Sequence, residues 1–168
     1  AKELGSDFNH RFTSLILLNL KGQHVMGKRI LLADDHKILR DGLRALLETH
    51  MGKKVVGEAE NGMQAVQLAR KLKPEVIIMD ISMADLNGIE ATKQILQEQP
   101  TIKVIALSMY SEKRFVADML RAGAMGYLLK DCAFEELEEA IATVVANRRY
   151  ISPSLTGDVL DDYAEKLQ

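Results

Sequence analysis

Residues 76–88 read VIIMDISMADLNG, and this stretch decides how the rest of the chain is interpreted. Its first four residues form an apolar run that is typical of a short strand buried on both faces. Asp80 follows the run directly, and an Asn-Gly pair closes the loop behind it. A charge at the end of a buried strand is costly unless other groups compensate it. Asp80 therefore directs attention to whatever else converges on the same end of the strand.

The chain around this stretch alternates short apolar runs with amphipathic segments. The runs predict five strands, at 29–33, 54–59, 76–79, 103–107 and 126–129. Apolar residues at helical spacing predict five helices, which begin near residues 38, 65, 89, 116 and 134. This alternation predicts an α/β fold, a doubly wound (βα)5 flavodoxin-like three-layer sandwich with a parallel sheet. For a chain this short, we favour the strand order 2-1-3-4-5.

Composition limits the classes of function. With 168 residues, 47% hydrophobic and 27% charged, the chain has enough material for one globular domain and a short appendage. A net charge of −2 gives no bulk electrostatic case for binding nucleic acid or membranes. No apolar stretch approaches the roughly 20 residues that a membrane helix needs. Cys132 is the only cysteine, which excludes an intrachain disulfide and fits a cytoplasmic location.

The two ends of the chain differ from the middle. Residues 28–150 form the predicted domain. Residues 1–27 are interpreted as a leader or an extension added before Met26, with a packed extra strand or amphipathic helix as the alternative. In residues 151–168, apolar residues recur in steps of four and predict a linker or interaction helix capped by Ser152 or Ser154. Its polar face is acidic, which is unfavourable for contact with DNA.

Polar residues follow four of the five predicted strands. Asp34 and Asp35 follow the first strand, Asp80 the third, Ser108 the fourth and Lys130 the fifth. In a doubly wound sheet, ligands bind at the carboxyl ends of the strands near the point where the strand order reverses. The order 2-1-3-4-5 makes the first and third strands neighbours, so we expect these five side chains to share one edge.

These side chains predict a specific chemistry. Three crowded carboxylates repel one another unless a cation is present, and oxygen ligands alone suit Mg²⁺. A lysine and a hydroxyl opposite the metal are the groups expected around a phosphoryl group, with Asp80 as the nucleophile. Taken singly, each residue has a simpler interpretation as a turn former, helix cap or surface residue, and this applies most strongly to His36. The joint pattern favours the phosphoryl-transfer site.

Four sequence blocks carry a resemblance to a known family. They read ILLADDH (30–36), VIIMDISMADLNGIEA (76–91), VIALSMYSE (104–112) and GAMGYLLKD (123–131). They resemble the signature blocks of receiver domains in bacterial two-component response regulators, most closely those of the NarL/LuxR (FixJ) type. The resemblance covers about residues 28–150.

The resemblance implies a function for the acidic residues. Asp80 matches the aspartate that accepts a phosphoryl group from a sensor histidine kinase. Asp34 and Asp35 match the acidic pair, with Asp35 expected to bind Mg²⁺ directly and Asp34 through water. The backbone carbonyl of Ser82 would be a further metal ligand. The domain would be a signalling switch that catalyses its own phosphorylation and dephosphorylation.

The same resemblance implies how the signal leaves the site. Ser108 matches the switch hydroxyl that turns toward the phosphoryl group, and Lys130 matches the lysine that pairs with it. Tyr127 matches the aromatic residue whose ring moves inward when the hydroxyl moves. The expected result is a changed surface that controls a transcription-regulating output domain. That domain is a helix-turn-helix module in this subfamily and lies outside this chain, so we expect no specific DNA binding by these residues alone.

Ala84 and the terminal helix are the two places where this chain departs from what the subfamily leads us to expect. Ala84 stands where the family usually has proline, which frees the loop after Asp80 and puts the lifetime of the phosphoryl group in question. The terminal helix has no output domain to pack on, so it either pairs two chains as a homodimer or folds back on the receiver.

Two other classes of function compete with the receiver interpretation. An aspartyl-phosphate phosphatase usually has a second aspartate at the position of Ser82. A nucleotide-binding domain would need a glycine-rich phosphate loop, and neither common form is present.

Overall fold

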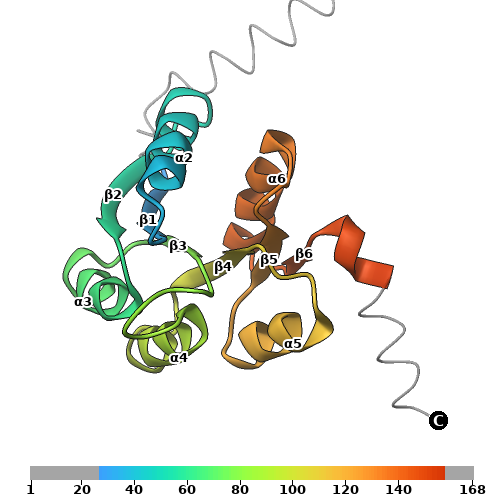
Figure 1. Cartoon of the computed structure of the whole chain (residues 1–168). Helices are drawn as coiled ribbons and strands as arrows, with labels where there is room; N and C mark the ends of the chain where they lie inside the picture. The colour runs from blue at the N-terminus through green and yellow to red at the C-terminus, as the bar shows by residue number, and fades with distance from the viewer. Residues whose placement is uncertain (1–26, 158–168) are drawn as a thin grey trace, which may run out of the picture.

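A six-stranded parallel sheet forms the centre of the structure (Figure 1). The computed structural model describes residues 27–157, so the predicted N-terminal extension lies almost wholly outside the described residues. The strand order is β2-β1-β3-β4-β5-β6. The strands are β1 (Arg29–Ala33), β2 (Lys54–Ala59), β3 (Val76–Met79), β4 (Lys103–Ser108), β5 (Gly126–Leu129) and β6 (Tyr150–Ile151). The predicted α/β class and the order 2-1-3-4-5 are confirmed, and β6 adds a sixth strand beside β5.

All five predicted helices are present, and they cover both faces of the sheet (Figure 1). They are α2 (Lys37–Thr49), α3 (Gly62–Leu72), α4 (Gly88–Glu98), α5 (Lys113–Arg121) and α6 (Phe134–Val145). Helices α3 and α4 begin at asparagines whose side chains cap the first turn: Asn61 accepts from the Gln64 N–H and Asn87 from the Glu90 N–H. The Asn87 cap ends the loop that started at Asp80, so this loop is short and its exit is fixed.

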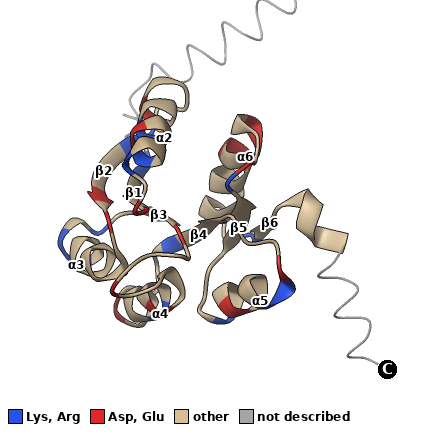
Figure 2. Cartoon of the chain, in the orientation of Figure 1, with Lys and Arg blue, Asp and Glu red and all other residues tan. Residues whose placement is uncertain are grey.

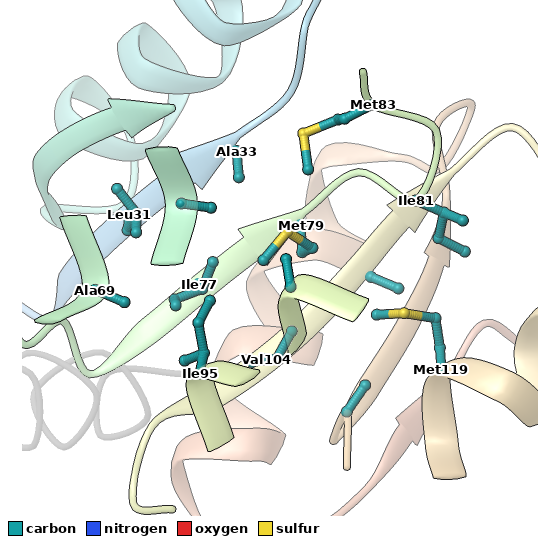
Figure 3. Close-up of a cluster of buried hydrophobic side chains, with 14 of the residues drawn as sticks. Leu31, Ala33, Ala69, Ile77, Met79, Ile81, Met83, Ile95, Val104 and Met119 are labelled. Atoms are coloured by element: carbon teal, nitrogen blue, oxygen red, sulfur yellow. The ribbon is translucent and has the colours of Figure 1, made fainter. Parts of the chain in front are cut away.

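Successive residues of each central strand enter opposite cores, which explains the continuous apolar runs. In β3, Ile77 and Met79 pack with α3, α4 and α5, whereas Val76 and Ile78 pack with α2 and α6. Figure 3 shows Ile77 and Met79 among side chains from both neighbouring strands and from α4 and α5. Strands β3 and β5 carry no charged residue, so charges lie on the helices, in the loops and at the ends of the sheet (Figure 2).

One residue of the predicted helical stripe lies outside the core. The helical spacing of apolar residues that predicts the first helix includes Ile38, but Ile38 is 88% exposed, whereas Leu43 and Leu47 are buried. Ile38 lies in the first turn of α2 and borders an open apolar hollow. None of the described helices is long and apolar enough to cross a membrane.

The segment after α6 differs from its prediction. Residues 150 and 151 form β6, which runs parallel to β5 and crosses the predicted boundary at residue 150. The Ser152 N–H continues this pairing by donating to the Tyr127 carbonyl at 2.9 Å, and a helical turn follows at 153–157. The Ser152 hydroxyl bonds to Glu136, so it does not serve as the predicted side-chain cap. Leu155 is buried, and the rest of the predicted stripe lies outside the described residues.

Candidate functional site

The sheet brings the acidic residues together at the carboxyl ends of β1 and β3. The Asp80 N–H donates to the Ala33 carbonyl at 2.8 Å, which continues the β1–β3 pairing by one residue. The Asp34 N–H donates to the Ala59 carbonyl at 3.0 Å, which does the same toward β2. Both aspartates are only 3% exposed. Strand pairing thus holds two buried carboxylates at the carboxyl end of the sheet.

Lys130 lies between these two carboxylates. Its Nζ is 2.7 Å from Asp34 Oδ2 and 3.2 Å from Asp80 Oδ2, and its side chain is 8% exposed. Strand β5 places it there, because the Lys130 N–H donates to the Ser108 carbonyl at the end of β4. Asp80 Oδ2 is buried and has no hydrogen bond of good geometry to any described residue, despite the nearby ammonium group. This oxygen is the least satisfied polar atom of the site.

Burial and charge shift the proton equilibria of this pair. Burial, and then the negative charge of Asp34, raise the pKa of Asp80 above its ordinary value, although Lys130 acts in the opposite direction. Burial disfavours the charge of Lys130, but its hydrogen bond to Asp34 and the charges of Asp80 and Asp34 together raise its pKa. The positive charge of Lys130 therefore offsets only part of the cost of burying the negative charge of Asp80 beside Asp34.

Asp35 and His36 lie at the rim of the same cluster. His36 Nδ1 is 3.1 Å from Asp34 Oδ1 and 2.9 Å from Asp35 Oδ1, and the His36 N–H donates to Asp34 Oδ1 at 2.8 Å. The His36 side chain is 70% exposed, and although His36 stands at the N-cap position of α2, its side chain makes no capping bond. One potential ligand atom from each of Asp34, Asp35, His36 and Asp80 lies within 4.8 Å of the others.

Two hollows open at this end of the sheet. A pocket of about 220 Å³ gives access to Asp80; it is lined by Asp35, His36, Asp80, Ser82, Met109, Tyr110 and Lys130. Beside it lies an apolar hollow of about 690 Å³, lined by His36, Ile38, Leu39, Gly42, Leu43, Leu46, Met109 and Lys130. His36, Met109 and Lys130 border both, so the polar pocket opens next to an apolar surface.

Ser108 and Tyr127 lie behind the pocket rather than in its wall. Both are fully buried. Ser108 Oγ accepts from the Tyr110 N–H at 3.0 Å, and the Tyr127 hydroxyl donates to the Tyr110 carbonyl at 2.7 Å. The Tyr110 hydroxyl donates to Ser82 Oγ at 3.4 Å, so this residue connects the pocket to both. Tyr110 was not singled out in the sequence.

Residues 30–142 match the response regulator receiver domain family. The chain belongs to this family. It is 41% identical over 127 residues to the response regulator GacA of Pseudomonas aeruginosa, which covers 76% of this chain and 59% of GacA. A LuxR-family two-component response regulator from Aurantimonas sp. SI85-9A1 superposes with a TM-score of 0.78 at 34% identity, covering 82% of this chain and 99% of that one.

The receiver domain of RcsB from Salmonella enterica serovar Typhimurium, solved with the phosphomimetic BeF3⁻, gives a TM-score of 0.70 at 28% identity, covering 77% of this chain and 96% of that one. Receiver domains are signalling switches of two-component systems rather than conventional enzymes. The chain spans less than two thirds of the length of curated relatives such as GacA.

The acidic pocket of this receiver domain fits a hard divalent cation. The atoms that could bind a metal are carboxylate oxygens of three aspartates and a ring nitrogen of the exposed His36, and Asp80 Oδ2 is buried without a hydrogen-bond partner among the described residues. Three carboxylates face one lysine, so an added positive charge would reduce their mutual repulsion. Asp34, Asp35 and Asp80 therefore provide a donor set that suits Mg²⁺.

Sequence reasoning missed a buried arginine next to the acidic pair. Arg40 is 3% exposed and donates to the Asp34 carbonyl from Nη1 at 2.5 Å. A signal was present in the helix pattern, because Arg40 precedes Leu43 and Leu47 at the spacing of the buried stripe of α2. An arginine on the apolar face of a helix predicts a buried partner.

Proposed function

We propose that this receiver domain is a phosphorylation-dependent switch in which Asp80 accepts a phosphoryl group from a sensor histidine kinase. Mg²⁺ would be held by Asp34, Asp35, Asp80 and the Ser82 carbonyl, and would supply charge neutralisation on the phosphoryl oxygens. The observation that carries the proposal is Asp80 Oδ2, which is buried, has no hydrogen-bond partner among the described residues, and belongs to a residue that lines an open pocket beside Lys130.

The residues of the chain have distinct tasks in this transfer. An Asp80 carboxylate oxygen forms the new O–P bond while the P–N bond to the donor histidine breaks, and the imidazole nitrogen of the donor keeps the bonding electrons and takes up a proton. The last β1–β3 hydrogen bond fixes the nucleophile at the pocket floor. Lys130 stabilises the added negative charge from Nζ. Water attack on the acyl phosphate would later regenerate Asp80.

The buried hydroxyls provide a route out of the site. The Ser108 hydroxyl would donate to a phosphoryl oxygen, and turning toward it would strain the bond that Ser108 Oγ now accepts from the Tyr110 N–H, which holds the backbone to which Tyr127 is tied. Tyr127 is in turn bonded through its carbonyl to Ser152. We propose that this chain of contacts carries the signal through β6 toward residues 158–168 and a transcription-regulating output domain. Where no output domain covers them, these terminal residues would pair two chains or fold back on the receiver.

The apolar hollow supports a docking place for the kinase. Ile38 and Met109 are 88% and 74% exposed, and both border the hollow next to the Asp80 pocket. A helix that presents a phosphohistidine to Asp80 would cover these side chains. Ile38→Ser should therefore slow transfer from a histidine kinase while leaving labelling by a small acyl phosphate unchanged. Equal slowing with both donors would contradict this docking place.

Intact-mass spectrometry tests the central proposal. A small acyl phosphate with Mg²⁺ should add one phosphoryl group to the chain, and neither Asp80→Asn nor wild type in a chelator should be labelled. Asp85→Asn is a matched control, because Asp85 is an exposed acid in the same loop. Equal labelling of wild type and Asp80→Asn would refute the assignment. Rapid multiple turnover of small phosphate esters would instead indicate a phosphatase.

A further inference from the structure

Helix α2 contains a buried cation that the tasks above do not use. Arg40 is 3% exposed, and its guanidinium group reaches three acceptors, one after β1 and two at the end of β2. Nη1 donates to the Asp34 carbonyl at 2.5 Å, Nη2 to Glu60 Oε1 at 3.0 Å and Nε to Glu58 Oε2 at 3.4 Å. A buried charge is costly unless it is paired and hydrogen-bonded, and Arg40 has both kinds of partner.

The bond to Asp34 fixes the peptide group that joins Asp34 to Asp35. The Asp34 N–H is held by the Ala59 carbonyl at 3.0 Å, and its carbonyl is held by Arg40, so the backbone is anchored on both sides of the residue. Asp35 has less support of its own, because its carboxylate is 41% exposed and its side-chain contact among the described residues is with the exposed His36. The direction of the Asp35 side chain therefore depends on the orientation of this peptide group.

We propose that Arg40 is a positioning residue that presents Asp35 to the divalent cation, an inference that rests on the proposed function of the acidic pocket. Glu58 and Glu60 balance the charge of the guanidinium group, so Arg40 acts through geometry rather than by repelling a cation. Groups that orient a metal ligand from behind typically change metal affinity about 10–100-fold when they are replaced.

Arg44 provides a matched control on the same helix. It lies one turn further along and bonds the same glutamate, from Nε to Glu58 Oε1 at 2.5 Å. Its other partners are Glu48 and the Val55 carbonyl, and it has no hydrogen bond to the acidic pair. Its side chain is 37% exposed. Arg44→Gln thus removes a similar charge from the same network without releasing the Asp34 carbonyl.

Binding of Mn²⁺ alone, followed by the electron paramagnetic resonance signal of the free ion, tests the proposal on the full chain. Arg40→Lys keeps the charge but lacks the planar fork that joins Asp34 to Glu60, so its Kd should rise about 10–100-fold. Arg44→Gln should bind within about threefold of wild type. Circular dichroism and the thermal midpoint check that each variant is folded.

A second variant decides the matter if Arg40→Lys does not fold. Glu60→Gln weakens one anchor of the guanidinium group at a side chain that is 65% exposed, and should weaken Mn²⁺ binding at least threefold while folding normally. Wild-type affinity in Arg40→Lys, or in Glu60→Gln where Arg40→Lys does not fold, would overturn the positioning role, as would an equal loss in Arg44→Gln. A wild-type chain that binds no Mn²⁺ would overturn the acidic-pocket proposal itself, which is a different outcome.

Discussion

The two ends of the central sheet differ in the burial and pairing of their charged side chains. At the amino end, Lys28 Nζ pairs with Glu75 Oε1 at 2.8 Å, and the two side chains are 40% and 45% exposed. Arg29 beside them donates to the backbone carbonyls of Leu72 and Lys73. At the carboxyl end, the buried aspartates 34 and 80 share one lysine, with Asp35 at the rim.

The carboxyl end of the sheet is arranged for binding, and the amino end is not. Both ends have the same strand geometry, so the contrast lies in burial and in the balance of charge. The Lys28–Glu75 pair at the amino end keeps contact with water, and exposed pairs of this kind contribute little to stability and are weakened by salt. The carboxyl end keeps a buried carboxylate oxygen without a good partner among the described residues, a cost to folding that a bound cation or phosphoryl group would remove.

The largest effect should come from the backbone that holds Asp80. A Cβ at Gly88 would lie 2.0 Å from the Asp80 carbonyl oxygen and 3.0 Å from the Ile81 Cα, and backbone atoms cannot move aside cheaply. We expect Gly88→Ala to lower the free energy of unfolding by about 3 kcal/mol. Gly42→Ala is the control, because no atom lies within 4 Å of its added Cβ and the helix should gain up to about 1 kcal/mol. Urea denaturation measures both variants. A Gly88→Ala midpoint equal to that of wild type would show that the loop shifts to accommodate the added Cβ.

Binding of Mg²⁺ should stabilise the folded domain through residues at the carboxyl end of the sheet and not through those at the amino end. An ion that binds the folded state stabilises it by about 2.7 kcal/mol at 100 times its Kd. Asp35→Asn should abolish this gain, whereas Glu75→Gln at the amino end should leave it unchanged. Thermal unfolding with and without Mg²⁺ provides the measurement. A gain that survives in Asp35→Asn would place the ion elsewhere.

Removing the buried charge should stabilise the metal-free domain. Burial and Asp34 raise the pKa of Asp80 in the folded state, so its contribution to stability is complete below the unfolded pKa and is lost as pH rises through the folded pKa. Asp80→Asn mimics the neutral form and should be about 1 kcal/mol more stable than wild type at pH 7. Lys130 keeps its contact with Asp34 in this variant. Urea unfolding in a chelator at pH 4 and pH 7 should show the gain only at pH 7; a variant less stable than wild type at pH 7 would contradict it.

The main parts of the fold and the site follow from local sequence rules. Apolar runs separated by helical stripes specify a parallel sheet, and the strand order then forces residues such as Asp34, Asp80 and Lys130 to meet at one end. This part of the prediction needs no side-chain detail. By contrast, β6 has two residues and exists because β5 leaves an open edge, which no local pattern reveals. The burial of Arg40 depends similarly on Glu58 and Glu60 from another segment.

The loop after Asp80 shows the same limit. The sequence predicts that Ala84 frees this loop, and the structure adds two backbone hydrogen bonds within it. The Leu86 N–H donates to the Ala84 carbonyl at 2.7 Å around Asp85, whose φ is 64°, and the Gly88 N–H donates to the Ile81 carbonyl at 2.9 Å. These bonds depend on the backbone path, which the residue types alone do not specify. The effect of Ala84 on phosphoryl lifetime stays a prediction.

We expect the smallest effect at the amino end of the sheet. The hydrogen bond from Lys28 lowers the pKa of Glu75, so its contribution to stability is present above the unfolded pKa and lost as pH falls through the folded pKa. Because the pair is exposed, Glu75→Gln should cost only about 0.5 kcal/mol at pH 7 and low salt, and less at 1 M salt. The cost should vanish near pH 3. The two ends of the sheet thus predict opposite signs at pH 7, a loss for Glu75→Gln and a gain for Asp80→Asn, and equal signs in parallel urea titrations would remove the distinction between them.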